Sequence, residues 1–317
     1  MTTPAPLAST ERVLDWAELP PRARQVHERG MDPAQAGVLM RHQVEWIDFR
    51  RELDIAVAEK SRRSGITLSE ALDDTIIAAS SAAAGGSDVY YIGDTKEKGL
   101  EFVGYCAGFA RTIARGAAAG ASTGIELFLF EDQDPDTGES RQISSYRIRF
   151  ASGYQIVALS SRPSNIRGLQ GIVVIDEAAF HPDVQGVIDA SIALLMWGGQ
   201  IRIISTHNGV RSPFNELIRD IRRGDYGDAA GVYRIDFDTC VANGLYERRC
   251  WMKGSKPTEE GKAKWYTRMR KGYGPRTAAM REELDVVPRD GSGAALPTIW
   301  IERAMPAGAP RPVLPYH

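Results

Sequence analysis

The sequence predicts an α/β fold in which a mainly parallel central sheet is flanked by helices and extended by antiparallel strands. Three observations predict this class. A run of four β-branched residues at 172–175 ends in Asp176 and Glu177, which is typical of a strand buried on both faces of a parallel sheet. Strand-like and helix-like segments alternate along most of the chain. Residues 125–150 instead hold two strand-like segments joined by turn residues, which indicates an antiparallel hairpin at the sheet's edge.

Composition narrows the class of protein. The chain has 317 residues, 43% of them hydrophobic and 25% charged, which is typical of a globular protein. The formal net charge of -2 gives no overall basic character, so any contact with nucleic acid must come from a local patch. The three cysteines lack the spacing of a metal site or a disulfide framework, which suits a reducing cytoplasm. No apolar run is long enough to span a bilayer, so we expect a protein that is neither exported nor embedded.

The chain divides into three parts by composition. Residues 1–36 are rich in proline and alanine and are expected to form an N-terminal arm. Residues 37–287 carry the periodic segments and are expected to form the main domain, with a basic subregion at 248–276. Residues 288–317 are rich in glycine and proline, which is typical of a linker or tail.

Each element of the main domain follows from its own pattern. Short apolar runs bounded by polar or turn residues predict strands, which lie at 55–58, 88–93, 154–159, 172–175, 200–205 and 232–235. Helical patterns predict helices before, between and after these strands, at about 38–49, 68–84, 96–114, 183–195, 212–223 and 259–271.

The segment at 59–67, EKSRRSGIT, has the strand, loop and helix order of a phosphate-binding loop. Compared with G-x-x-x-x-G-K-[ST], it keeps Gly65 and Thr67, but Ile66 replaces the lysine and Lys60 replaces the first glycine. The cradle can survive this change, because backbone N–H groups and a helix N-terminus make most of it. Thr67 would bind Mg²⁺ and Lys60 would reach the phosphates. The other loop positions expected at the nucleotide are Ser61, Arg62, Arg63 and Ser64. A basic surface turn is the alternative.

Asp176 and Glu177 lie at the carboxyl end of their strand, where open α/β sheets bind ligands. In nucleotide hydrolases one acid at this position holds Mg²⁺ and a second orients the attacking water. The alternative is that the two acids only open a turn. Arg167, in the loop before this strand, is placed where it could reach a phosphate, although a lone loop arginine is more often a salt-bridge partner.

Two further strand-end or helical positions carry polar side chains. Thr206 follows the strand that ends at Ser205, and this segment could sense a terminal phosphate or the attacking water. Gln43 lies in the first helix and offers the donor and acceptor needed to read adenine. A solvent-facing glutamine is the alternative for Gln43.

The basic subregion at 248–276 has ten lysines and arginines against two acids, interleaved with aromatic residues. This composition suits a track along a phosphate backbone, but a helix of this kind can equally present a solvated charged face. The residues chosen as candidate DNA contacts are Lys262, Lys264, Arg268 and Arg270.

With both nucleotide motifs present in this order, the chain resembles the ATPase domain of tailed-phage terminase large subunits, most closely those of Mu-like phages and prophages. The stretches that carry the resemblance are EKSRRSGIT, IRGLQGIVVIDEAAFHP and IISTHNG, supported by LMRHQVEWI and FDTCVANGLYERRC. It covers about residues 39–296 and implies a P-loop NTPase-like fold.

The resemblance also implies roles, with ATP and Mg²⁺ as cofactors. It makes Asp176 the Mg²⁺ ligand, Glu177 the catalytic base and Gln43 the adenine reader. It gives Arg62 or Arg167 as the arginine finger. The pair Ser205 and Thr206 would form the motif that couples hydrolysis to movement.

The implied function is an ATP-hydrolysing motor that translocates double-stranded DNA into a procapsid. Its partners would be the DNA, the portal protein, the small terminase subunit and further copies of itself in a ring on the capsid. The isolated chain is expected to be a monomer, in the host bacterial cytoplasm and transiently at the portal vertex. No nuclease activity is expected, because the family's nuclease domain would begin where this chain ends. The alternatives are a helicase-like DNA-dependent ATPase outside packaging and a non-hydrolysing nucleotide-binding or DNA-binding adaptor.

Overall fold

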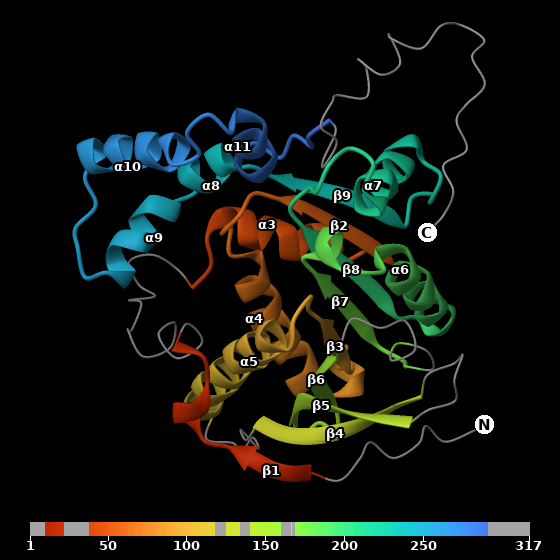
Figure 1. The fold of residues 1–317 in the computed structure, drawn as a ribbon. Coiled ribbons are helices and arrows are strands. Elements are labelled where there is room, and N and C mark those ends of the chain that lie inside the picture. Colours follow the sequence, from red (N-terminus) through yellow and green to blue (C-terminus); the bar gives the residue numbers. More distant parts are fainter. Residues whose placement is uncertain are drawn as a thin grey trace, which may run out of the picture.

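The computed structural model describes residues 10–21, 38–117, 125–133, 140–159, 166 and 169–290. These residues form a nine-stranded sheet in the order β1-β4-β5-β6-β3-β7-β8-β2-β9 (Figure 1). The strands are β1 (Thr10–Leu14), β2 (Ile55–Lys60), β3 (Val89–Ile92), β4 (Ile125–Gln133), β5 (Ser140–Arg149), β6 (Gln155–Leu159), β7 (Ile172–Asp176), β8 (Gln200–Ser205) and β9 (Ala230–Ile235).

The strands from β6 to β9 in that order are parallel, and β1, β4 and β5 extend the sheet in antiparallel fashion. This is the predicted fold class. The part of the predicted arm that is described, residues 10–21, includes β1, which pairs with β4 at the sheet's edge. The segment predicted as a tail lies outside the described residues beyond position 290.

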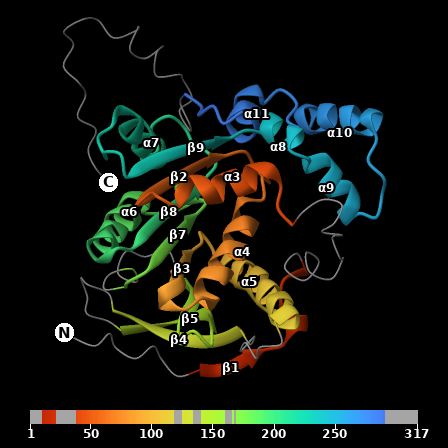
Figure 2. The same cartoon turned by 180° about the vertical axis from the view of Figure 1, so that it is seen from behind.

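Helices cover both faces of the sheet (Figures 1 and 2). They are α3 (Arg41–Arg50), α4 (Ile66–Ala79), α5 (Lys96–Ala117), α6 (Val184–Ile192), α7 (Pro213–Arg223), α8 (Phe237–Ala242), α9 (Leu245–Met252), α10 (Glu259–Lys271) and α11 (Thr277–Leu284). Short 3-10 turns lie at 16–18, 82–84, 178–180 and 193–197. None of the helices in the described part of the chain is long and apolar enough to cross a membrane.

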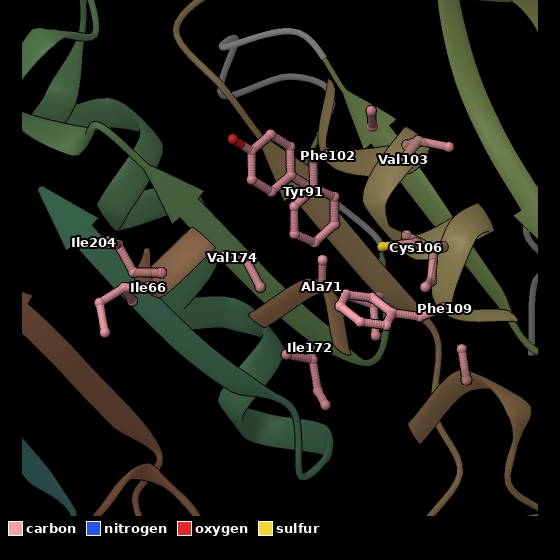
Figure 3. Packing of buried hydrophobic residues seen from close by; sticks show 14 of the residues in the cluster. Ile66, Ala71, Tyr91, Phe102, Val103, Cys106, Phe109, Ile172, Val174 and Ile204 are labelled. Atoms are coloured by element: carbon pink, nitrogen blue, oxygen red, sulfur yellow. The ribbon is translucent and has the colours of Figure 1, made fainter. Parts of the chain in front are cut away.

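Strand β7 shows why the acids at its end hold their position. Ile172 and Val174 pack in the cluster formed with α4 and α5 (Figure 3), whereas Val173 and Ile175 pack in the cluster formed with α6 and α7. Burial of each such side chain is worth about 1.5–3 kcal/mol. Because side chains alternate along a strand, a slip of one residue would exchange the two sets. The packing therefore fixes Asp176 at the sheet's carboxyl edge.

Helices α8 to α11 follow β9 and pack around a hydrophobic cluster of their own. Its buried members are Phe237, Val241, Tyr246, Cys250, Trp265 and Leu284. These helices lie beside the carboxyl ends of the parallel strands, as both views of the chain show (Figures 1 and 2). They are thus placed to contribute side chains to that edge of the sheet.

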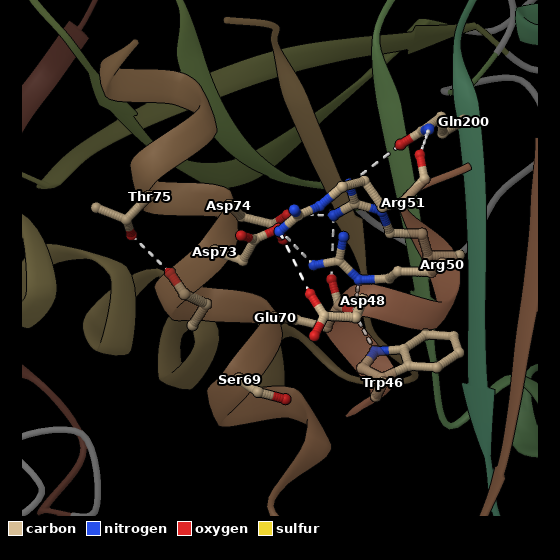
Figure 4. Close-up of polar contacts among 12 residues, drawn as sticks. Trp46, Asp48, Arg50, Arg51, Ser69, Glu70, Asp73, Asp74, Thr75 and Gln200 are labelled. Carbon is tan, nitrogen blue, oxygen red and sulfur yellow. Dashed lines mark hydrogen bonds and ion pairs between the residues drawn. The ribbon is translucent and has the colours of Figure 1, made fainter. Parts of the chain in front are cut away.

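A buried set of charges joins α3, α4 and β8 (Figure 4). Arg50 donates to Glu70 at 2.8 Å, and Arg202 donates to Asp74 at 2.6 Å and to Glu70 at 3.2 Å. The indole of Trp46 also donates to Glu70. We call this set the ionic cluster, with the members Arg50, Glu70, Asp73, Asp74 and Arg202. It fixes the helix that follows the phosphate loop against the sheet.

Candidate active site

The predicted nucleotide motifs meet at the carboxyl edge of the sheet. Strand β8 lies between β2, which leads into the phosphate loop, and β7, which ends in the two acids. Parallel strands end at one edge, so Lys60, Ser205 and Asp176 converge there. A cavity of about 410 Å³, which we call the phosphate-loop cavity, opens between the loop at 60–68 and the acids Asp176 and Glu177.

Helix α3 orients the backbone of the phosphate loop. A ring nitrogen of His42 lies 2.9 Å from the Ser64 carbonyl oxygen, and Gln43 Nε2 donates to the Gly65 carbonyl oxygen at 2.6 Å. Across a planar trans peptide the N–H points opposite to the carbonyl. The N–H groups of Gly65 and Ile66 therefore point away from α3. Ile66 also begins α4, whose first N–H groups have no partner within the helix and suit a phosphate.

Gly65 is required by both its conformation and its surroundings. Its φ of 80° is in the left-handed region, and a Cβ at this position would lie 2.7 Å from Gln43 Nε2. Gln43 Oε1 in turn accepts from the Met40 N–H at 2.7 Å. The amide that we expected to read adenine thus binds backbone groups on both sides and positions the loop. Its contact with a nucleotide base stays a prediction.

Asp176 receives two hydroxyl donors. Thr67 Oγ1 donates to Asp176 Oδ2 at 2.8 Å, and the Tyr91 hydroxyl donates to the same oxygen at 2.9 Å. Burial raises the pKa of Asp176, and the adjacent Glu177 carboxylate raises it further. Ile66, at the position of the usual lysine, is buried in the core near Ile204 (Figure 3). The loop therefore brings a hydroxyl, and not a cation, to Asp176.

Glu177 is paired with Lys60, the cation that the sequence analysis expects at the phosphates. Lys60 Nζ donates to Glu177 Oε1 at 3.0 Å, and the Lys60 side chain is only 6% exposed. Burial alone would raise the pKa of Glu177, but the Lys60 ammonium brings it below its ordinary value. Glu177 Oε2 is buried without a hydrogen-bond partner. The backbone of Glu177 is left-handed, with φ of 51°, a strained conformation that is often found at functional sites.

The two arginines of the loop are placed differently from Lys60. Arg62 Nη1 donates to Glu283 Oε2 of α11 at 2.9 Å, and its side chain is 58% exposed. Arg63 is exposed and left-handed, with φ of 62°, and Ser61 is buried at the end of β2. Both arginines line the phosphate-loop cavity, as does Ser64. Arg167 lies outside the described residues.

The segment after β8 is bound to the turn after the acids. Ser205 Oγ accepts from the Ala179 N–H at 3.1 Å, and Asn208 Nδ2 donates to the Ala179 carbonyl at 3.2 Å. Thr206 is buried and lines a second cavity of about 230 Å³, which we call the coupling cavity. Glu177 lines both cavities. The turn after the acids thus holds Ser205 and Asn208 through hydrogen bonds to one residue, Ala179.

The structure divides the four candidate DNA contacts into two pairs. Lys262 donates to Glu247 at 3.0 Å, and Arg270 donates to Asp238 at 3.0 Å, so these two cations hold α10 against its neighbours. Lys264 and Arg268 are exposed instead, and Lys264 pairs only with Glu260 of the same helix on the surface. With one further lysine they form what we call the basic face of α10, namely Lys264, Arg268 and Lys271.

Three residues at the site were missed by the sequence analysis. Tyr91 lies within the strand β3, Lys98 lies in the first turn of α5 after that strand, and Glu283 comes from α11. Lys98 could have been found by the rule that located the other residues, because β3 ends at the same edge as β7. Nothing local in the sequence marks Tyr91 or Glu283.

The residues present fit a magnesium ion. Mg²⁺ takes oxygen ligands, and at phosphate sites one or two come from the protein while water and phosphates supply the rest. Asp176 and Thr67 offer two oxygen atoms 2.8 Å apart at the cavity wall. Among the described residues no three His, Cys, Asp or Glu side chains gather as a metal site, so these two would need ligands from substrate and water.

Two known proteins resemble this chain in sequence. No model of a known protein family matches the chain. The chain is 43% identical over 271 residues to the Mu-like prophage FluMu protein gp28 of Haemophilus influenzae, a match that covers 86% of this chain and 50% of that protein. It is 40% identical over 285 residues to the "Probable terminase, large subunit gp28" of Escherichia phage Mu, covering 89% and 49%. The chain thus spans about half the length of these two relatives.

A solved structure shares the fold. The large terminase ATPase domain of Thermus phage P74-26 matches with a TM-score of 0.51 and 18% identity, over 79% of this chain and 94% of that domain. The predicted fold class is therefore confirmed. So is the predicted resemblance to Mu-like terminase large subunits, which the two gp28 proteins show by sequence.

Proposed function

Since this chain resembles the large terminase subunits of Mu-like phages in sequence and a terminase ATPase domain in fold, we propose that it hydrolyses ATP to move double-stranded DNA. One observation carries the proposal. Across a single cavity, the chain pairs Lys60 with Glu177 and Thr67 with Asp176, beside a loop whose N–H groups point away from the helix that holds it. A cation, two acids, a hydroxyl group and loop N–H groups are what nucleotide hydrolases use to bind and hydrolyse a nucleoside triphosphate.

Each group has its own task in the proposed site. The loop N–H groups and Lys60 bind the phosphates, and Asp176 and Thr67 would hold Mg²⁺, which when bound neutralises charge on the phosphate oxygens. Lys60 leaves Glu177 as it turns to the phosphates, and Glu177 then orients the attacking water. While Lys60 is bound to it, the pKa of Glu177 is lowered, so the carboxylate is ionised before the nucleotide arrives.

The arginine finger comes from Arg62 or Arg167 in our proposal. Arg62 lies at the cavity but is paired with Glu283, so it must leave that partner to reach a phosphate. Fingers of this kind are worth about a thousandfold or more in rate. If the finger is supplied by a neighbouring copy in a ring, the isolated chain should hydrolyse ATP slowly.

The basic face of α10 is the surface we propose for the DNA backbone. Lys264, Arg268 and Lys271 are exposed at positions four and three residues apart, which places them on one side of the helix. We further propose that the chain acts at a procapsid with a portal protein, a small terminase subunit and other copies of itself, in the host bacterial cytoplasm.

A phosphate-release assay with Mg²⁺ and ATP, with and without duplex DNA, tests the ATPase proposal. We expect hydrolysis that DNA stimulates and that is lost in Glu177→Gln, which serves as the matched inactive control. Binding of ATP without hydrolysis would favour the alternative function, a non-hydrolysing adaptor. Strand separation during hydrolysis would favour the helicase-like alternative.

The DNA proposal has a separate test. The triple variant Lys264→Glu, Arg268→Glu and Lys271→Glu should weaken duplex binding with little sequence preference. The log–log slope of affinity against salt should become shallower by about 0.9 for each phosphate that the variant no longer neutralises. Reversal of two exposed arginines on α7, Arg219→Glu with Arg223→Glu, is the control. Equal losses of duplex binding in the two variants would contradict the assignment of α10 as the DNA-binding surface.

A further inference from the structure

The two cavities adjoin at Glu177, and only a few lining residues belong to both. The phosphate-loop cavity and the coupling cavity have three residues in common, Arg62, Lys98 and Glu177. A nucleotide whose phosphates lie on the loop must turn its terminal phosphate toward the water that Glu177 orients. That phosphate is then expected at this shared wall, where Lys98 supplies a positive charge that the sequence motifs did not include.

Lys98 reaches the wall from the side opposite the phosphate loop. It lies in the first turn of α5, just after β3, and in the sheet β7 and β8 separate β3 from β2. Its ammonium is 3.0 Å from Asp94 Oδ1, but this oxygen has no aligned hydrogen bond, and the Lys98 side chain is 38% exposed. Lys98 is therefore held loosely and can move toward a phosphate.

Two of the other cations near the acids already have partners, and Arg63 lies exposed in the left-handed turn of the loop. Lys60 is hydrogen-bonded to Glu177 and is almost fully buried, and Arg62 is paired with Glu283. The lysine of a standard phosphate loop is replaced by Ile66, whose side chain is in the core.

We propose that Lys98 contacts the terminal phosphate of the bound nucleotide from the β3 side of the cavity and stabilises the charge that it carries during hydrolysis. A compact ammonium on a flexible stem suits this task, since it can leave Asp94 when the phosphate arrives. Lys60 and Lys98 would then bracket the phosphates from opposite sides. This inference rests on the proposed ATPase function.

Binding of a transition-state mimic tests the proposal. The 317-residue chain and its variants are titrated with ADP, and with ADP plus aluminium fluoride, in the presence of Mg²⁺. Removing a preorganised group that stabilises transition-state charge typically costs about 100- to 1000-fold. Lys98→Ala should therefore show about a hundredfold weaker affinity for the mimic and a similarly slower single-turnover rate, while ADP affinity stays within about threefold. Lys98→Arg should recover part of the loss.

The matched control is Lys96→Ala. Lys96 lies two residues away on the same helix, but its ammonium is 5.6 Å from the Tyr146 ring centroid and it lines neither cavity. We expect it to behave as the parent chain. Asp94→Ala tests the remaining explanation, in which Lys98 serves only to hold Asp94. In that case Lys98→Ala and Asp94→Ala would lose equal affinity for the mimic.

The outcomes are distinct. If the parent binds the mimic and Lys98→Ala binds it as tightly as Lys96→Ala does, the role of Lys98 is wrong and the ATPase proposal stands. If the parent binds neither ADP nor the mimic, the proposed function itself fails. Circular dichroism on Lys98→Ala and on a second variant, Lys98→Gln, shows that a loss of affinity does not come from unfolding.

Discussion

Two groups of buried charges in this protein start from the same imbalance and resolve it in different ways. The ionic cluster has two arginines and three carboxylates, and the site has Lys60 with Asp176 and Glu177, so each carries one more acid than base. The ionic cluster is sealed under α3 and α4, where burial raises the pKa of Asp74 to about 8. A proton on Asp74 removes the excess negative charge of the ionic cluster.

The site instead faces a cavity. Burial raises the pKa of Asp176, as it does that of Asp74, but Lys60 holds the pKa of Glu177 below its ordinary value, and the second oxygen of Glu177 has no hydrogen-bond partner. A cation that enters the cavity can pair with this oxygen, which the buried ionic cluster does not allow. The comparison teaches that imbalance alone does not mark a functional site. What distinguishes the candidate site is a carboxylate oxygen without a hydrogen-bond partner, at a cavity that a ligand can enter.

The largest expected effect is a difference in kind between the two acids of the site. Glu177→Gln should bind Mg·ATP nearly as the parent does and hydrolyse it about a thousandfold more slowly, because the water loses its ionised, basic acceptor. Asp176→Ala should lose the dependence of ATP binding on Mg²⁺, because the oxygen ligand is gone. Titration of a fluorescent ATP analogue with and without Mg²⁺, together with phosphate release, measures both. Equal loss of Mg·ATP affinity in the two variants would contradict this division of roles.

The next effect is on stability and belongs to the ionic cluster. Glu70→Ala should destabilise the fold by about 3–5 kcal/mol, because it breaks buried ion pairs to both arginines, which keep only Asp73 and Asp74, and removes the acceptor of the Trp46 indole. Denaturant unfolding measures the loss. The control is Glu260→Ala, whose carboxylate is 77% exposed and pairs only with Lys264 on the surface, and which should change stability by less than about 1 kcal/mol. A loss in Glu70→Ala as small as in the control would mean that the ionic cluster does not hold α4.

A third prediction distinguishes the two cations of the phosphate loop. Lys60→Ala should lose about 2–3 kcal/mol of ATP binding, or about thirty- to a hundredfold, because it also leaves Glu177 unpaired beside the phosphates. Arg62→Ala should keep binding and lose turnover, because a planar guanidinium suits transition-state charge. The same analogue titration compares the two variants. If Lys60→Ala binds as tightly as the parent, then Arg62 or Arg63 must take its place at the phosphates.

Local patterns predicted the elements of this fold well and its long-range contacts poorly. The bounds of β8 and α10 agree with the prediction, since each has a continuous pattern between clear turn residues. Strand β2 runs two residues further than predicted, through Lys60, because β9 pairs with it there. That extension fixes Lys60 at the end of a rigid strand, where the sequence suggested the base of a loop.

The candidate site was predicted from strand ends, and what escaped prediction lies far away in sequence. Tyr91 is 85 residues from Asp176, and Glu283 is 221 residues from Arg62. No motif near either acid or arginine signals such a partner, because the contact depends on strand order and on where α11 packs. The ionic cluster escaped for the same reason, as its charges come from α3, α4 and β8.

The smallest effect tests the proton in the ionic cluster. An acid whose pKa is about 8 when folded and near 4 when unfolded binds more protons in the folded state between these values, so stability falls as pH rises through that window. The slope approaches about 1.4 kcal/mol per pH unit for one proton. Asp74→Asn keeps the shape and the acceptor for Arg202 but cannot ionise, so its stability should fall less steeply. Denaturant unfolding of both proteins at pH 5, 6 and 7 measures the difference in slope. Parallel slopes would mean that Asp74 is ionised in the fold and that the ionic cluster keeps its excess negative charge.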